Sequence, residues 1–291
     1  MNDVRRYVAQ HERDCWEELR RFTDARIALG HAGASMPTAE LLRFSLAHAQ
    51  ARDAVHLPLD KTLVRSQLED LGLDVVDVHS DAPDRHTFLT RPDLGRRLCE
   101  ESRTKLQDLA FKGCCVQSQE SECADSDLCS EAKSASAPDI VFVVGDGLSA
   151  KAVHRQAVAL LRETMPYMRR LGLAVAPIVL AEQCRVALGD EIAQLLHARL
   201  VAMLIGERPG LSSPDSLGVY LTYAPHIGSL DSERNCLSNI RPEGLPHPRA
   251  AFKLAWLVES ALAIAATGTA LKDQSDDSRQ WLTLRPMTGI Q

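Results

Sequence analysis

The chain has 291 residues, 45% of them hydrophobic, and a formal net charge of -6. This length and apolar content are enough for one large domain or two moderate ones with a real core. Basic residues alternate with acidic ones instead of gathering in blocks, so no nucleic-acid partner is expected. The most apolar stretch is interrupted by Lys253 and Glu259, and the N-terminus lacks the apolar run of a signal peptide. We therefore expect a soluble, intracellular protein with no membrane-spanning helix.

Eight cysteines occur in the chain, four of them in GCCVQSQESECADSDLC at 113–129. Since the chain is long and carries no export signal, we expect free thiols and not a disulfide framework. The spacing of the four clustered cysteines does not match the two paired Cys-x-x-Cys knuckles of structural zinc, so we expect no metal site there.

The first 112 residues are expected to be mostly helical. Apolar periodicity predicts helices over 1–21, in LLRFSLAHAQARDAV at 41–55 and in KTLVRSQLEDLG at 61–72, followed by a short strand at 74–78. Thr38 or Ser35 is expected to cap the second helix, and Gly72 to end the third.

Residues 113–137 change to serine, alanine, acids and cysteine, and we place a disordered linker and a domain boundary there. Beyond it the pattern predicts, in order, strand 139–144, helix 149–163, strand 173–180, helix 189–199, strand 200–205, strand 217–223, a long loop to His247 and a final helix from Pro248. Apolar strands alternating with amphipathic helices indicate the α/β class. We therefore expect a C-terminal, Rossmann-like parallel sheet over 138–291, with helices on both faces.

The stretch VVGDGLSA fits the Gly-x-Gly-x-x-Ala form of a dinucleotide-binding turn between a strand and a helix, with Gly145 and Gly147 as its glycines. The acidic residue that binds the ribose should follow about 20 residues later, whereas Glu182 lies 35 residues past Gly147. Asp146 would also place a carboxylate where a pyrophosphate binds. Two interpretations stay open: an NAD(P)-dependent oxidoreductase, or a tight turn with no ligand.

Three other segments carry candidate residues. GERPG follows a predicted strand, so Glu207 and Arg208 either face a ligand at the carboxyl edge of the sheet or pair with each other in a solvated turn. DVHSDA nearly matches a corrinoid histidine motif, but Ala82 replaces its glycine, and we expect His79 to be an ordinary surface residue. Cys236, in the polar loop ERNCLSNIRPEG, is expected to be a buried, inert thiol. No catalytic set of side chains stands out.

Taken together, several stretches resemble the small (light) subunit of ethanolamine ammonia-lyase, an adenosylcobalamin-dependent enzyme. They occur in the family's order between residues 23 and 266 and are ARIALGHAGASMPT, LAHAQARDAVH, FLTRPDLGRRL, VGDGLSAKAVHRQA, GERPGL and ERNCLSNIRPEG. Their combination is far more specific than any one motif.

The resemblance implies a division of labour between two chains. A large subunit, a TIM barrel, binds ethanolamine, and this chain completes the cobalamin site for radical conversion of ethanolamine to acetaldehyde and ammonia. The catalytic residues then lie in the partner, residues 138–291 bind cobalamin, and residues 1–112 dock on the large subunit. Val186, Glu207 and Cys236 match family positions that contact adenosylcobalamin. Val186 would give apolar contact, Glu207 would accept hydrogen bonds, and Cys236 would pack against the macrocycle.

The sequence departs from the family pattern at His31 and Met36, where Arg and Leu are expected, and at Gly145, where alanine is common. The cysteine-rich insert is a further departure. The resemblance implies a cytoplasmic location, either free or inside a bacterial microcompartment. The helix before residue 23 has two open roles, docking on the large subunit or directing the enzyme into such a compartment.

Overall fold

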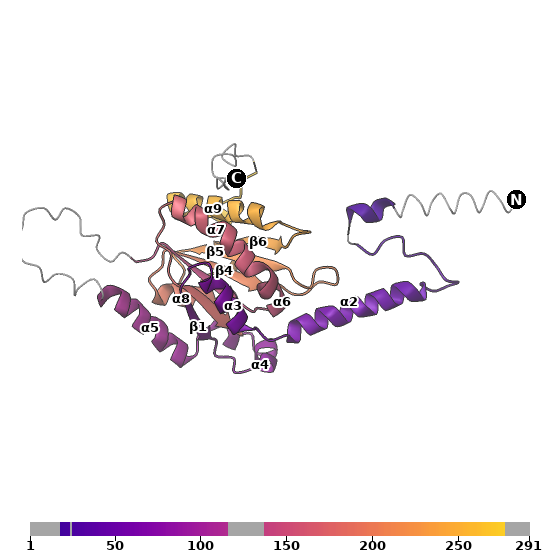
Figure 1. Ribbon diagram of the computed structural model, residues 1–291, viewed down its shortest axis with the longest axis horizontal. Helices are drawn as coiled ribbons and strands as arrows, with labels where there is room; N and C mark the ends of the chain where they lie inside the picture. Colours follow the sequence, from indigo (N-terminus) through magenta and orange to yellow (C-terminus); the bar gives the residue numbers. More distant parts are fainter. Residues whose placement is uncertain (1–17, 24, 116–136, 277–291) are drawn as a thin grey trace, which may run out of the picture.

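A computed structural model describes residues 18–23, 25–115 and 137–276. These residues form one six-stranded sheet in the order β1-β3-β2-β4-β5-β6, with helices packed against it (Figure 1). The strands are β1 (Val75–His79), β2 (Ile140–Gly145), β3 (Ile178–Glu182), β4 (Leu200–Gly206), β5 (Leu217–Tyr223) and β6 (Arg234–Ile240). The strands from β1 to β4 are parallel, whereas β5 and β6 are antiparallel to their neighbours. The protein is therefore a mixed α/β protein with a mostly parallel sheet.

Helices α2 (Thr38–His56) and α3 (Lys61–Glu69) precede the first strand, and α9 (His247–Ile264) follows the last strand. Between successive parallel strands lie α4 (Arg85–Thr90), α5 (Glu100–Cys115), α6 (Ala150–Ala152), α7 (Val158–Arg170) and α8 (Leu188–Leu195). The π-helical turn η3 (Val153–Ala157) joins α6 to α7. Short 3-10 turns are η1 (Arg20–Phe22), η2 (Leu94–Arg96), η4 (Asp231–Glu233) and η5 (Gly268–Ala270).

Two local predictions about the N-terminal region have different outcomes. Pro37 occupies the N-cap of α2 and no side chain caps this helix, so the expected cap by Thr38 or Ser35 is wrong. The helix expected over residues 1–21 lies almost wholly outside the described residues, and so does most of the linker expected over 113–137, although helix α5 continues to Cys115 and therefore includes the first three residues of that linker.

The strand predicted at 74–78 is present as β1, but its place in the central sheet was not predicted, and β6 lies where the sequence predicted a loop. β1 comes from the N-terminal half, yet its whole length pairs with β3, so the sheet is not confined to residues after 138. β6 occupies the segment expected to be a loop. The sequence of β6 is mostly polar, so it lacks the apolar pattern that predicts a strand. Of its apolar residues, only Leu237 and Ile240 are buried against the core. An edge strand needs apolar residues on one face alone.

Both faces of the sheet are covered by helices, as predicted. Phe142 and Val144 of β2 point into the larger core, which contains residues of α3, α7 and α9. Val141 and Val143 point into the opposite core, which contains residues of α5 and α8. A parallel strand buried on both faces needs apolar residues throughout, and every residue of β2 is buried.

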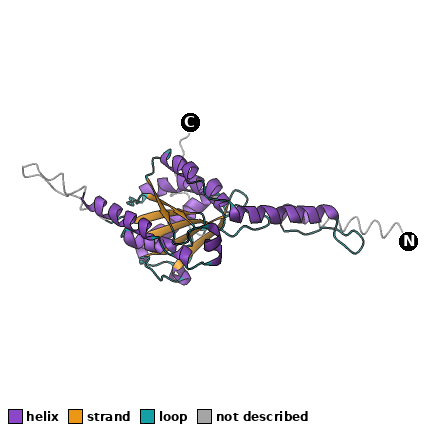
Figure 2. Ribbon diagram, turned by 90° about the horizontal axis from the view of Figure 1, so that it is seen from below, coloured by secondary structure: helices purple, strands orange, loops and turns teal. Residues whose placement is uncertain are grey.

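The connection from β2 to β3 and the connection from β3 to β4 lie on opposite faces of the sheet. The chain from β2 to β3 passes through α7 on one face, whereas the chain from β3 to β4 passes through α8 on the other. Adjacent strands whose connections diverge leave a crevice at their carboxyl ends, which is where open α/β sheets bind ligands. In both views α2 projects away from this α/β body (Figures 1 and 2). None of the described helices has the length and apolar character needed to cross a membrane.

Candidate cofactor site

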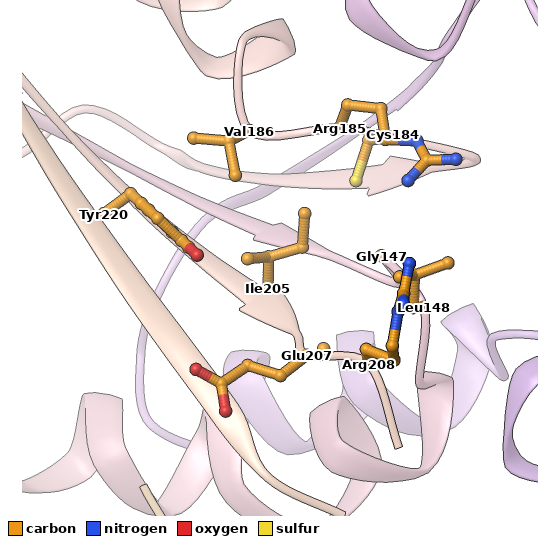
Figure 3. A pocket seen from close by; sticks show the side chains of 10 residues that line it. Gly147, Leu148, Cys184, Arg185, Val186, Ile205, Glu207, Arg208 and Tyr220 are labelled. Atoms are coloured by element: carbon orange, nitrogen blue, oxygen red, sulfur yellow. The ribbon is translucent and has the colours of Figure 1, made fainter. Parts of the chain in front are cut away.

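A cavity of about 340 Å³ opens at the carboxyl edge of the sheet (Figure 3). Small-molecule sites have volumes of roughly 300–1,000 Å³, so this cavity is at the small end of that range. Its walls come from the segments that follow β2 and β3, from the end of β4, and from β5. The lining residues are Gly147, Leu148, Cys184, Arg185, Val186, Ile205, Gly206, Glu207, Arg208 and Tyr220.

The turn after β2 forms one wall, and close packing accounts for its second glycine. Gly147 has a φ of 53°, and a Cβ atom at this position would lie 2.4 Å from the carbonyl oxygen of Gly206. The backbone N–H of Leu148 donates to that same oxygen at 2.9 Å. Both the left-handed backbone and the contact with β4 therefore require glycine, whether or not a dinucleotide binds.

Asp146 does not point into the cavity, contrary to the sequence prediction. Its carboxylate is buried and accepts hydrogen bonds from the backbone N–H of Cys184 at 3.1 Å and from the Arg85 guanidinium at 3.2 Å. Burial raises the pKa of Asp146, against the lowering effect of the Arg85 charge. Glu182 is also directed elsewhere, since it forms a 2.5 Å ion pair with Lys61. Neither acid is placed to bind a dinucleotide ribose in this cavity.

The N-terminal region supports the floor of the cavity through α4. Arg85 donates to the carbonyl oxygen of Gly147 at 2.8 Å and to that of Val55 at 2.7 Å. The guanidinium groups of Arg85 and Arg185 both lie over the Phe88 ring, at 4.7 and 4.2 Å from its centroid. Apart from the Arg85–Phe88 contact within α4, these contacts join segments 30 to 97 residues apart, so sequence periodicity does not reveal them.

Val186 and Tyr220 lie on the same side of the cavity, away from Gly147 and Leu148 (Figure 3). The backbone N–H of Arg185 donates to the carbonyl oxygen of Gly95 at 2.7 Å, which fixes the loop that carries Val186. Burial raises the pKa of Tyr220 to about 12, so its hydroxyl stays protonated at neutral pH. Ile205 adds a further apolar group to the lining.

Cys236 is next to the cavity but does not line it. It pairs with Tyr220 across β5 and β6, and its thiol is hydrogen-bonded to the Tyr220 hydroxyl. The expectation of a buried thiol is wrong, because Cys236 is exposed. In an antiparallel pair, directly opposite residues share one face of the sheet, so Cys236 and Tyr220 lie together on the face that carries the cavity.

Glu207 is held by the strand β6 and the loop before β5. Its carboxylate accepts hydrogen bonds from the hydroxyls of Ser216 at 2.5 Å and Ser238 at 2.6 Å, and from the backbone N–H of Asn239 at 3.4 Å. A carboxylate offers about four acceptor sites, so one remains for a ligand. The alternative in which Glu207 pairs with Arg208 is wrong.

The structure therefore brings Val186 and Glu207 around one cavity and places Cys236 beside it. The sequence analysis did not identify Tyr220 or Arg185 as lining residues. The alternation of residues along β5 could have indicated Tyr220, and Arg185 could have been considered because it directly precedes Val186. His79 lies at the end of β1, where its Nδ1 is 2.7 Å from the carbonyl oxygen of Ser80. Within the described residues, no cluster of three or more His, Cys, Asp or Glu side chains is arranged to hold a metal ion.

An open α/β sheet with a small cavity at the divergence of its connections defines an α/β protein of the cofactor- or ligand-binding class. The family model described as "Ethanolamine ammonia-lyase light chain (EutC)" matches residues 13–272. The chain belongs to this ethanolamine ammonia-lyase light chain family.

Curated relatives agree with this assignment. The ethanolamine ammonia-lyase small subunit of Rhodopseudomonas palustris is 50% identical over 258 residues, which cover 89% of this chain and 90% of the relative. The small subunit of Xanthomonas campestris pv. campestris is 48% identical over 264 residues, or 91% of this chain and 89% of the relative. The small subunit of Azotobacter vinelandii is also 48% identical over 264 residues, which cover 91% of this chain and 90% of the relative.

Proposed function

We propose that this chain is the small subunit of a cytoplasmic, adenosylcobalamin-dependent ethanolamine ammonia-lyase. It completes the cobalamin site with a Rossmann-like cobalamin-binding domain, which residues 138–291 form together with β1. The observation that carries the proposal is the single cavity that Val186 and Glu207 share, with Cys236 beside it. The chain's family membership supplies the name of the cofactor and of the substrate.

The residues of the cavity fit part of a corrinoid. Val186 and Ile205 offer apolar contact and exclude water, while the free acceptor site of Glu207 suits an amide N–H or a sugar hydroxyl. Because a volume of about 340 Å³ is small for a macrocycle with its side chains, the rest of the cofactor has to lie against the partner chain. When bound, the cofactor supplies the radical chemistry that converts ethanolamine to acetaldehyde and ammonia.

We assign the docking of the large subunit to the N-terminal region, and to α2 in particular. Its large apolar side chains are exposed, including Leu42 at 64% and Leu46 at 60%, and Ala54 is the one fully buried residue of this helix. A helix of a soluble protein normally buries an apolar stripe, and contiguous exposed apolar surface marks interaction sites. The relatives' name, small subunit, implies a large subunit, and we infer that this large subunit covers the exposed apolar residues of α2.

Reconstitution tests this function. The chain alone should not deaminate ethanolamine, whereas the chain with its large subunit and adenosylcobalamin should release acetaldehyde and ammonia well above the large subunit alone. Leu42→Asp should reduce co-elution of the two subunits, while Thr104→Asp, an exposed substitution on α5, serves as the control. No gain in activity on mixing would refute the proposed function.

A further inference from the structure

We propose that Arg185 and Arg208 bind the phosphodiester of the cofactor's nucleotide tail at one end of the cavity. This inference rests on the proposed function and deepens it, because it assigns one chemical group of the corrinoid to two residues of this chain. It also orients the tail: the phosphodiester lies at the arginine end, and the base and sugar lie toward Tyr220 and Glu207.

The two arginines lie at the same end of the cavity. Both line it, one from the loop after β3 and the other from the end of β4. In Figure 3 the Arg208 guanidinium lies beside Gly147 and Leu148 and the Arg185 guanidinium lies nearer Cys184 on the same side of the cavity, whereas Tyr220 lies on the opposite side. A ligand group between the two arginines would therefore also approach the backbone of the turn after β2.

Positive charge at this end is not balanced by nearby acids. The Nε atom of Arg185 is buried and has no hydrogen-bond partner, although its terminal nitrogen donates to the carbonyl oxygen of Phe88 at 3.0 Å. Burial lowers the pKa of Arg185, and the charges of Arg96 and Arg85 lower it further. In the part of the chain that the structure describes, Arg208 forms no ion pair.

The acid whose charge acts on Arg185 is already engaged. Asp146 accepts from Arg85 and from the backbone of Cys184, and it is almost completely buried. A buried guanidinium nitrogen without an acceptor is costly unless a ligand provides one. Repulsion among clustered arginines is likewise relieved by a bound anion, and guanidinium groups bind phosphate oxygens in a planar, bidentate manner.

The phosphodiester is the part of a cobalamin that fits this description, because the groups on the corrin periphery are neutral amides. The opposite end of the cavity carries the Glu207 carboxylate, which repels an anion and accepts hydrogen bonds from sugar hydroxyls. Val186 and Ile205 provide an apolar surface for a flat base. The charges along the cavity thus match a nucleotide in one orientation.

Comparison of two corrinoids in the reconstituted two-subunit complex tests this assignment. Hydroxocobalamin carries the nucleotide tail, whereas diaquacobinamide lacks the phosphodiester, sugar and base. Arg208→Ala should weaken hydroxocobalamin binding about tenfold or more in a spectroscopic titration, which corresponds to about 1.4 kcal/mol. Binding of diaquacobinamide should change less than about twofold, because a lost arginine–phosphate contact affects only the ligand that has the phosphate.

The variants are chosen so that misfolding does not imitate the result. Arg208 is exposed, so its replacement should leave the fold intact, and Arg208→Lys should retain part of the affinity. Arg185→Ala should reproduce the selective loss. Arg199→Ala is the matched control, since Arg199 is an exposed arginine at the opposite edge of the sheet, paired with Asp139. It should change neither affinity.

Several outcomes would overturn the inference. An equal loss for both corrinoids, or no loss for either, would show that the two arginines do not bind the phosphodiester. Arginine-dependent binding of NADH that is tighter than that of hydroxocobalamin would assign the phosphate contact to a dinucleotide. A wild-type complex that binds neither corrinoid would refute the proposed function itself, a result separate from the failure of the arginine variants alone.

Discussion

Replacement of Gly145 by alanine should destabilise the protein through one identifiable contact. Gly145 ends β2, and its backbone is outside the left-handed region, so the backbone itself permits alanine. An added Cβ atom, however, would lie 2.1 Å from the Sγ atom of Cys184 and 2.8 Å from the Cε atom of Met203. Favourable contacts between heavy atoms occur at about 3.5–4.0 Å, so at least one neighbour has to move.

The size of the effect follows from which neighbour is able to move. The Met203 methyl is the end of a flexible side chain, whereas Cys184 is fully buried and its Sγ contacts Asp146 and the carbonyl oxygen of Ala181. Overpacking of a core costs about 1–3 kcal/mol, and loss of glycine's flexibility in the unfolded chain returns about 0.4–1 kcal/mol. We therefore expect Gly145→Ala to lower the free energy of unfolding by about 1–2 kcal/mol.

A double-mutant cycle separates this contact from other causes. Cys184→Ala alone should cost about 1 kcal/mol for the cavity it leaves, but with Gly145→Ala the new methyl group fills the space of the missing sulfur. The double variant should thus be more stable than the sum of the single effects predicts, by about 1–2 kcal/mol. Urea unfolding followed by circular dichroism measures all four proteins. Gly189→Ala is the control, because a Cβ there meets its nearest atom at 3.3 Å. Additive effects would refute the reasoning.

Two further predictions concern buried charges on α8. Asp190 and Arg234 form a bidentate ion pair at 2.6 and 2.7 Å, and their side chains are 1% and 3% exposed. Asp190→Asn should therefore lower the free energy of unfolding, measured with urea, by about 3–5 kcal/mol. A decrease of less than about 1 kcal/mol would contradict this prediction. Burial raises the pKa of Glu191, but hydrogen bonds from Arg97 and the backbone of Leu98 outweigh it, so its pKa is below the usual 4.5. Glu191 therefore stabilises the fold above pH 4.5, and that contribution is lost as the pH falls through the lower folded-state pKa. The stability gap between wild type and Glu191→Gln should shrink below pH 4.5, and a gap independent of pH would exclude this explanation.

Strands and helices with a regular pattern of apolar residues were predictable from the amino-acid sequence alone. Continuous apolar runs predicted the central parallel strands, and the strand expected at 217–223 is β5 in full. The order of strands and helices placed the loops that carry Val186 and Glu207 at one edge of the sheet. These features follow from periodicity and connection rules, which depend on neighbours in the chain. Combined motifs also identified the family that the comparisons show.

Contacts between segments far apart in the chain became visible only in the folded protein. The pairing of β1 with β3 joins residues about 100 positions apart, and β6 is a strand because β5 supplies its backbone partners. The direction of the Asp146 carboxylate depends on Arg85, which lies 61 residues earlier in the chain. Tyr220 and Arg185 enter the cavity through strand pairing and loop packing. Such contacts depend on three-dimensional packing and hydrogen bonding between distant residues. A local sequence pattern does not indicate which distant residue a side chain will contact.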